Sequence, residues 1–211
     1  IDTISNQVVF ELYSLYLKDL NFLFDGKVKI DYFNEKIDYY GNFYYENLQS
    51  NINVEMTKKI AKFYLVSEPF KSLKFLKNFL HLPNIAESWM YDNVKGDIKI
   101  EELYAEYDLI NNHIIENSIQ GKAQIKDAKI RFHKDVDAVN TKSLDIFFKD
   151  NRLHFNLMEP MFKDKKLDGS FVLINNLTSE KNGQVDVFLK TNSKLDKDIL
   201  VKGNKIYSPE T

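Results

Sequence analysis

The chain of 211 residues contains no cysteine, which excludes disulfides, thiol catalysis and cysteine-based metal sites. Glycine and proline are also scarce, with seven and four residues, and arginine occurs only as Arg131 and Arg152. No apolar run is long enough to form a membrane-spanning helix. The net charge is -2 and no basic block stands out, so we expect no nucleic-acid partner.

Sequence motifs for catalysis are missing as well. The four histidines are scattered, and the Walker, GxGxxG, GxSxG and HExxH patterns do not occur. We therefore expect no catalytic residues, no bound metal and no cofactor. An enzyme such as a hydrolase, with an active site that carries no motif, is kept as a third hypothesis.

The sequence does contain β-strand alternation. Lys27–Phe33 and Leu48–Met56 each alternate apolar with polar residues, and aromatic residues, which suit strands, make up 14% of the chain. This period of two predicts strands with one apolar and one polar face. Because the strands follow one another through short turns, we expect neighbours to pair antiparallel in a meander.

Similar patterns predict roughly ten strands in all. Asn34-Glu35, Asp150-Asn151 and Lys181-Asn182-Gly183 are expected to form tight turns between them. The other strands are predicted over Val8–Leu17, Ile37–Tyr45, Ile60–Val66, Asp97–Leu109, Ile119–His133, Leu144–Phe148, Leu153–Leu157, both sides of Gly169, and Val185–Leu189.

The stretch Pro69–Gly96 has a different period. From Phe70 to Leu80 apolar residues recur at spacings of three and four, which predicts a helix. Pro83 breaks this run, and Asn84–Tyr91 can form a second short helix that carries the only tryptophan, Trp89. We expect this helical pair to pack on one face of the sheet or to close one end of it.

The helical stretch divides the chain. We expect an N-terminal β-meander over residues 1–66, a helical segment over 67–95 and a C-terminal β-sheet over 96–211, together forming one continuous domain. We interpret the chain as a fragment of a longer protein, so that any targeting segment or membrane anchor would lie outside it.

Strands of this kind must bury an extended apolar face. The sheet can fold into a sandwich, close into a barrel, or curl round something apolar that is not protein. The third option is a binding groove. The pattern by itself favours a self-buried sandwich or barrel.

Three segments carry a resemblance to a known family: LPNIAESWMYDNVKGDIKIEELYAEYDL, GKAQIKDAKIRFHKDVDAVNTKSLDIFFKDNRLHFNL and KLDGSFVLINNL. A tryptophan segment precedes a glycine-led strand at Gly96, a link at Val136–Asn140 leads to a hairpin at Leu144–Leu157, and a strand from Gly169 follows. In this order of motifs, which covers roughly Pro69–Leu189, the chain resembles the AsmA/TamB/YhdP-like superfamily, in particular its YhdP-like members. Lys95 stands where the family has a first glycine.

The resemblance implies a curved, twisted antiparallel β-sheet that forms a half-barrel-like groove. It also implies a non-enzymatic periplasmic module, anchored in the inner membrane by a segment outside this chain, that binds phospholipid or another acyl-chain lipid. Such a module contributes to phospholipid transport between inner and outer membrane and to outer-membrane biogenesis. The lipid-binding residues implied on the groove face are Ile30, Ile52, Val54, Ile98, Ile100, Ile130, Phe132, Ile146, Phe148, Phe155 and Phe171.

With the resemblance included, a lipid-transfer module becomes the first hypothesis. The alternative is a structural or protein-interaction β-domain of the bacterial envelope whose core is filled by its own side chains. Exposed sheet edges and apolar surface also make self-association an expected property of the isolated chain.

Overall fold

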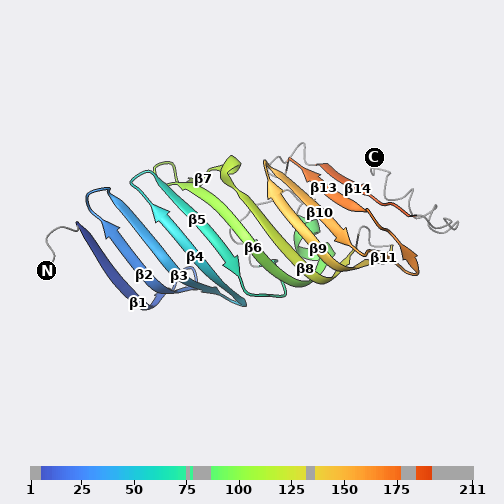
Figure 1. The fold of residues 1–211 in the computed structure, drawn as a ribbon, viewed down its shortest axis with the longest axis horizontal. Coiled ribbons are helices and arrows are strands. Elements are labelled where there is room, and N and C mark those ends of the chain that lie inside the picture. Colours follow the sequence, from blue (N-terminus) through green and yellow to red (C-terminus); the bar gives the residue numbers. More distant parts are fainter. Residues whose placement is uncertain (1–5, 75–76, 78–86, 132–135, 177–183, 192–211) are drawn as a thin grey trace. The chain divides into compact units, whose positions relative to one another are not determined.

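The computed structural model describes residues 6–74, 77, 87–131, 136–176 and 184–191. These residues form mainly β-structure, in one open antiparallel sheet of 14 strands (Figure 1). Along the sheet the order is β1-β2-β3-β4-β5-β6-β8-β9-β10-β13-β14, while β7, β11 and β12 lie off this path. The strands are β1 (Gln7–Leu17), β2 (Phe22–Asp31), β3 (Lys36–Tyr45), β4 (Leu48–Met56), β5 (Ile60–Ser67), β6 (Val94–Asp108), β7 (His113–Ile114), β8 (Gln120–Ile130), β9 (Val139–Lys149), β10 (Arg152–Met158), β11 (Met161–Phe162), β12 (Lys165–Lys166), β13 (Phe171–Asn175) and β14 (Gln184–Phe188).

The chain divides into two compact units that are interleaved in sequence. Unit 1 comprises residues 1–71, 98–123 and 147–151. Unit 2 comprises residues 72–97, 124–146 and 152–211. Strands β6, β8 and β9 therefore contribute residues to both units.

The expected antiparallel meander is confirmed. Each strand from β1 to β6 pairs antiparallel with the next one along the chain. The strand predicted over Leu48–Met56 has those bounds in β4. Asp150 and Asn151 form the expected turn between β9 and β10, and both have the positive φ, 51° and 60°, that a tight hairpin turn requires. The turn predicted at 181–183 lies outside the described residues.

The expected pair of helices is not supported. Phe70 would begin the first helix, but its backbone N–H and C=O both bond Ile98 at 2.8 Å, so they are committed to the sheet. Residues 75, 76 and 78–86 lie outside the described part of the chain. The second helix is present in shorter form as a π-helix, η2 (Ser88–Asn93), which includes Trp89. A 3₁₀-helix, η3 (Glu116–Ser118), follows β7.

A glycine pair lies at the centre of the N-terminal meander. Gly26 in β2 pairs with Gly41 in β3, and Gly26 has a φ of 151°, which side-chain-bearing residues rarely adopt. A Cβ on Gly26 would lie 2.4 Å from the Tyr40 carbonyl oxygen. The Tyr39 side chain lies over the pair, since its hydroxyl contacts the carbonyl oxygens of Asp25 and Asn42 at 2.8 and 2.9 Å. The tyrosine thus covers backbone that the glycines leave bare.

We expect Gly26→Ala to lower the free energy of unfolding by about 2–4 kcal/mol, because both the φ and the contact with backbone oppose a Cβ. The matched control is Gly169→Ala, where φ is also positive at 82° but the nearest atom, in a flexible lysine side chain, is 3.6 Å away. That variant should lose about 1 kcal/mol. Urea unfolding followed by circular dichroism measures both, and equal losses would contradict the steric account.

The turn after β2 is organised by one carboxylate. Asp31 accepts hydrogen bonds from the backbone N–H groups of Phe33 and Asn34 at 3.1 and 3.0 Å, and from the side-chain amides of Gln7 and Asn34 at 2.9 and 3.0 Å. These donors lower the pKa of Asp31 to about 2, and the backbone N–H of Asn34 has the largest effect. Asp108 caps the turn after β6 in the same way, and its pKa is lowered too.

This geometry predicts a pH-dependent stability. Because the folded pKa of Asp31 lies below its ordinary value of 3.8, its contribution is fully present above that pH and is lost as the pH falls towards 2. Asp31→Asn should therefore be less stable than the original chain at pH 6, and the difference should shrink between pH 4 and 2. Thermal unfolding of both proteins over this range measures the difference. A gap that stays constant with pH would contradict the assignment.

Candidate functional site

The strand register of unit 1 separates apolar from charged side chains. Residues that pair directly across neighbouring strands lie on the same face of a sheet, and successive residues on one strand alternate between faces. The pairings give one row of Phe10, Val28, Tyr39, Val54, Phe63 and Ala105. The row beside it contains Val8, Ile30, Ile37, Met56, Ala61 and Tyr107.

The rows on the other side of Phe10 continue the same face. They run through Leu12, Gly26, Gly41, Ile52, Leu65 and Leu103, then Leu15, Phe24, Phe43, Ser50 and Ser67, and finally Leu17, Phe22, Tyr45 and Leu48. We call these rows together the apolar face of unit 1. No residue in them carries a charge.

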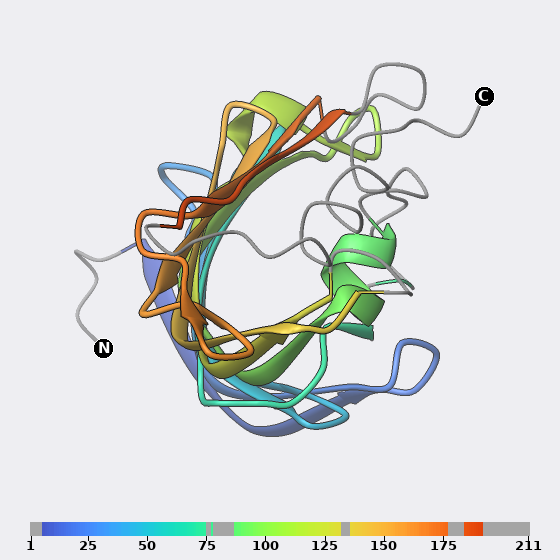
Figure 2. The same ribbon diagram turned by 90° about the vertical axis from the view of Figure 1, so that its right-hand side faces the viewer.

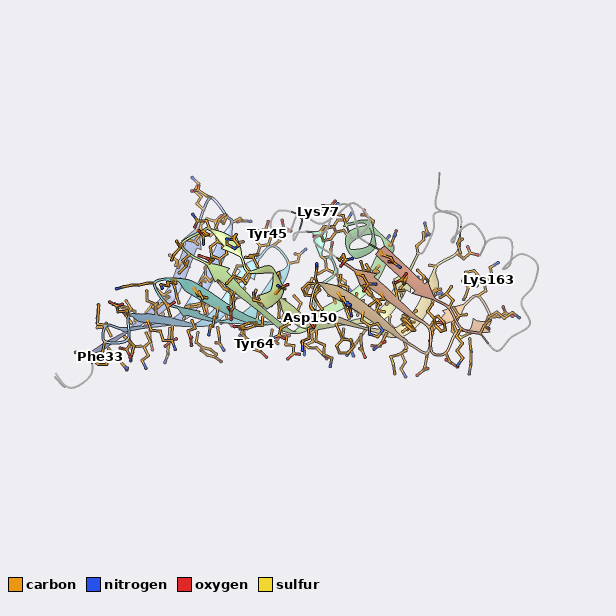
Figure 3. The ribbon with its side chains drawn as sticks, turned by 90° about the horizontal axis from the view of Figure 1, so that it is seen from above. Phe33, Tyr45, Tyr64, Lys77, Asp150 and Lys163 are labelled. Atoms are coloured by element: carbon orange, nitrogen blue, oxygen red, sulfur yellow. The ribbon has the colours of Figure 1, made fainter. Side chains whose placement is uncertain are left out.

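Much of the apolar face of unit 1 is uncovered. At the edge strand β1, Phe10 is 46% exposed, and Ile37 in β3 is 37% exposed. Ile30, Ile52, Val54 and Phe63 are half-buried. Figure 3 shows Tyr45, from this face, and Tyr64, from the other, on opposite sides of the sheet. Exposed apolar area of this extent is unusual unless a partner or ligand covers it.

Three hydroxyl groups on this face, those of Tyr39, Ser50 and Ser67, are bonded to the protein's own backbone. Tyr39 contacts two carbonyl oxygens, the Ser50 hydroxyl donates to the Phe43 carbonyl at 3.2 Å, and the Ser67 hydroxyl accepts from the Ile100 N–H at 2.8 Å. Burial, followed by the charge of Asp25, raises the pKa of Tyr39 to about 12, so this phenol stays neutral. These three hydroxyl groups therefore need no hydrogen-bond partner from a ligand on the face.

Aromatic rings concentrate at one end of the apolar face. Phe22 packs edge-on against Phe43 and Tyr45 with ring centroids 5.0 and 5.2 Å apart. Phe24 lies 5.2 Å from Phe43 and 5.9 Å from Tyr39. Such pairs stabilise a surface beyond the area they bury, so this end of the face is held rigid from within the sheet.

The corresponding apolar face in unit 2 is filled. Leu153 and Phe155 in β10 pair with Ile174 and Val172 in β13, and all four are buried. In β8 and β9, Ile130 and Leu144 are 1% and 0% exposed. The helix η2 of this unit brings in the buried side chain of Tyr91 (green coil in Figure 2). This part of the sheet has a core of its own.

The implied lipid-binding residues are thus found in different environments. Ile30, Ile52 and Val54 lie together on the apolar face of unit 1, and Ile146 and Phe148 in β9 are half-buried. Burial leaves four others almost no surface to offer to a ligand: Ile98, Ile100, Ile130 and Phe155. Phe132 lies outside the described residues.

Phe171 lies on the opposite face of the sheet from Phe155. It pairs with Asn156 and Phe188, whereas Phe155 pairs with Val172. Its ring stacks on Phe188 at 5.1 Å and meets the edge of His154 at 5.4 Å. Phe171 is therefore separated from the other implied residues.

The residues expected to bind lipid make up only a small part of the apolar face of unit 1. Val28, Phe43 and Phe63 lie beside the three implied residues and are equally half-buried. Their alternation was visible in the sequence, but only the register brings them into common rows with Ile30, Ile52 and Val54. In β1 a register irregularity between Leu12 and Leu15 also conceals which residues share the face.

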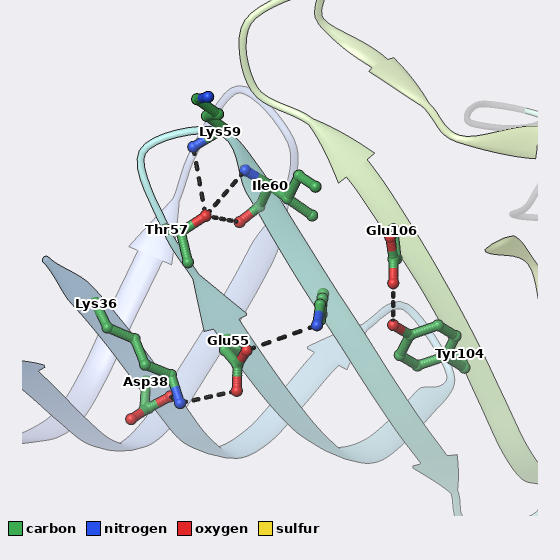
Figure 4. Close-up of polar contacts among 9 residues, drawn as sticks. Lys36, Asp38, Glu55, Thr57, Lys59, Ile60, Tyr104 and Glu106 are labelled. Carbon is green, nitrogen blue, oxygen red and sulfur yellow. Dashed lines mark hydrogen bonds and ion pairs between the residues drawn. The ribbon is translucent and has the colours of Figure 1, made fainter. Parts of the chain in front are cut away.

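The opposite face of unit 1 is polar and carries several ion pairs (Figure 4). Lys36 bridges Asp38 and Glu55 at 3.0 and 2.8 Å, and Lys62 lies 3.8 Å from Glu55. The hydrogen bond to Glu55 raises the pKa of Lys36, and Lys36 in turn lowers the pKa of Glu55. These exposed pairs keep this side of the sheet solvated.

Metal-binding clusters and membrane-spanning helices are absent from the part of the chain that the structure describes. No three His, Asp or Glu side chains there come together in a way that could hold a metal ion. No helix in the same part of the chain has the length and apolar character needed to cross a membrane.

The comparisons with known proteins give one match. A family model described as "YhdP protein" matches residues 80–200, more than half of the chain. No curated protein and no solved structure matches the chain.

The difference between the two apolar faces predicts different costs of truncation. Ile130→Ala should lower the free energy of unfolding by about 2–5 kcal/mol, because it opens a cavity in the filled core of unit 2. Ile52→Ala should lose about 1 kcal/mol or less, since Ile52 already borders solvent. Chemical denaturation measures both. A loss at Ile52 as large as that at Ile130 would mean that the face of unit 1 is covered.

Proposed function

The chain belongs to the YhdP family, and from this membership and the open apolar face of unit 1 we propose that it is a non-enzymatic lipid-binding module of the bacterial envelope. In this proposal the sheet of unit 1 is a curved, half-barrel-like groove. Acyl chains lie on its apolar face, and polar head groups stay at the rim, in water.

The observation that carries the proposal is the contrast between the two faces of unit 1. The rows of the apolar face contain no charge and include exposed or half-buried residues such as Phe10, Ile37 and Val54. The opposite face carries the ion pairs of Lys36, Glu55 and Lys62. The six strands β1 to β6 span roughly 25 Å at the usual strand spacing. An uncharged surface of this width, on which the hydroxyls of Tyr39, Ser50 and Ser67 are bonded to backbone, suits a ligand that is itself apolar and long.

The chemistry of transfer needs no reacting group. Burial of an acyl chain contributes about 0.8 kcal/mol per methylene, and this contribution is nearly the same at any position on a uniform apolar surface. A chain can therefore be held firmly and still slide from one row to the next. The residues we propose to contact it include Ile30, Ile52 and Val54, together with Val28, Phe43 and Phe63.

The finer parts of the proposal follow the family. We propose that the ligand is a phospholipid, that the module lies in the periplasm, and that a segment outside this chain anchors it in the inner membrane. It would then contribute to phospholipid transport between inner and outer membrane. Self-association through uncovered apolar surface is part of the same proposal for the isolated chain.

A second candidate function rests on unit 2. Its apolar face is filled by residues such as Leu144, Val172 and Ile174, which are at most 2% exposed. This part of the chain fits a structural or protein-interaction domain of the envelope whose core is self-contained. Lipid binding is proposed for unit 1, and the structural or protein-interaction role is the second candidate, for unit 2.

The proposal predicts that a charge on the apolar face abolishes lipid binding. Val54→Asp places a carboxylate between Tyr39 and Phe63. We expect the original chain, purified from bacteria without detergent, to carry phospholipid in native mass spectrometry and after organic extraction. Val54→Asp should lose this lipid because a buried carboxylate opposes an acyl chain.

The matched control is Val66→Asp. Val66 lies on the neighbouring strand β5 and on the polar face, where it pairs with Asn51. This variant should keep its lipid, and circular dichroism should show that both variants fold. A folded, lipid-free original chain, or equal lipid loss in both variants, would leave the structural role as the better description.

A further inference from the structure

The polar face of unit 1 carries a row of aromatic side chains. Tyr40 in β3, Tyr64 in β5 and Tyr104 in β6 fall in one cross-strand row, with Asn53 of β4 between the first two. Tyr40 and Tyr64 are 65% and 42% exposed. Phe147 in β9, 37% exposed, lies beyond them along the strand order. We call these four side chains the aromatic row.

The aromatic row borders two neighbouring hollows of about 400 Å³ each. The first is lined by Tyr40, Tyr64 and Tyr104, and the second by Tyr64, Tyr104 and Phe147. Tyr64 and Tyr104 therefore border both hollows, and Tyr64 projects from the side of the sheet opposite Tyr45 (Figure 3). The hollows follow one another across the strands.

Rings in the aromatic row are held in place. The Tyr104 hydroxyl donates to the Glu106 carboxylate (Figure 4), which raises the pKa of Tyr104 to about 12. The Lys122 ammonium group lies 5.8 Å from the centre of the Phe147 ring and 2.7 Å from Glu101. Rings that are fixed before binding lose little entropy when a ligand packs on them.

The spacing and polarity of the row indicate the ligand. Two strand intervals separate Tyr40 from Tyr64, which gives about 10 Å, and Tyr104 follows one interval, about 5 Å, beyond Tyr64. The first distance is close to the disaccharide repeat of an extended β-1,4-linked glycan, and the second is close to the length of one sugar. The amides of Asn53 and Gln120 and the carboxylate of Glu102 line the hollows, where they can bond sugar hydroxyls.

We infer that the aromatic row is a binding site for an extended, uncharged β-1,4-linked glycan. The C–H faces of the sugars pack on the aromatic rings, and the sugar hydroxyls bond the amides and carboxylates of the hollows. An uncharged glycan fits the first hollow, because the carboxylate of Glu55 there is paired with Lys36 and Lys62. The site lies on the face opposite the proposed lipid surface, so it stands independently of the lipid function.

The inference is tested by calorimetric titration of the whole chain with chitohexaose and cellohexaose. We expect binding that is about tenfold tighter for the hexasaccharide than for the trisaccharide, because only the longer chain spans both hollows. Tyr64→Ala should weaken binding by about tenfold, through loss of the ring shared by both hollows. Tyr64→Phe keeps the ring and should keep the affinity.

Two controls make the experiment decisive. Tyr32→Ala removes an exposed tyrosine, 62% exposed, from the turn after β2 and should leave affinity unchanged. Maltohexaose, whose α-1,4 linkage curls the chain, should not bind. Absence of binding by both β-linked hexasaccharides, or binding that Tyr64→Ala does not weaken, would overturn the inference. The lipid proposal is tested separately, by the lipid content of Val54→Asp, so neither result decides it.

Discussion

Two-residue alternation, carried unbroken from strand to strand, is the constraint on which the rest of unit 1 depends. Because pairing places Val28 beside Tyr39 and Val54 beside Phe63, a shift of one residue in any strand would bring charge to the apolar face. Lys27 and Lys29 flank Val28, and Asn53 and Glu55 flank Val54. The register therefore keeps charged side chains off the apolar face, and Lys27, Lys29 and Glu55 lie on the opposite face.

The two units show two outcomes for the same kind of sheet. In unit 2 the sheet is accompanied by η2, and its inward residues, such as Ile130 and Leu144, are fully buried. In unit 1, Phe10 and Ile37 stay 46% and 37% exposed. The alternation is similar in both, so exposure of the face depends on what packs against the strands and not on the strands themselves.

Short-range features could be predicted from the sequence. Strand β4 and the turn at Asp150 and Asn151 follow from local alternation and from side chains that tolerate positive φ. Phe70 was predicted helical because its spacing fits a helix, but a distant partner, Ile98, takes its backbone hydrogen bonds. Likewise Phe171 alternates like its neighbours, and only pairing with Asn156 shows which face it occupies. Only part of the candidate site can therefore be predicted from the sequence. The apolar alternation of its strands is local, whereas the strand register and the packing against the face depend on residues far apart in sequence.

Sequential pairing of the strands also affects how the sheet folds and how its width can change in evolution. Each strand from β2 to β6 finds its partner in the strand made just before it, so contact order in this region is low. The meander can grow strand by strand during synthesis, each completed edge acting as the template for the next. Because two strands return the chain to its starting direction, the gain or loss of one hairpin would alter the width of the sheet without exchanging its faces. Such a sheet can evolve in length by whole hairpins.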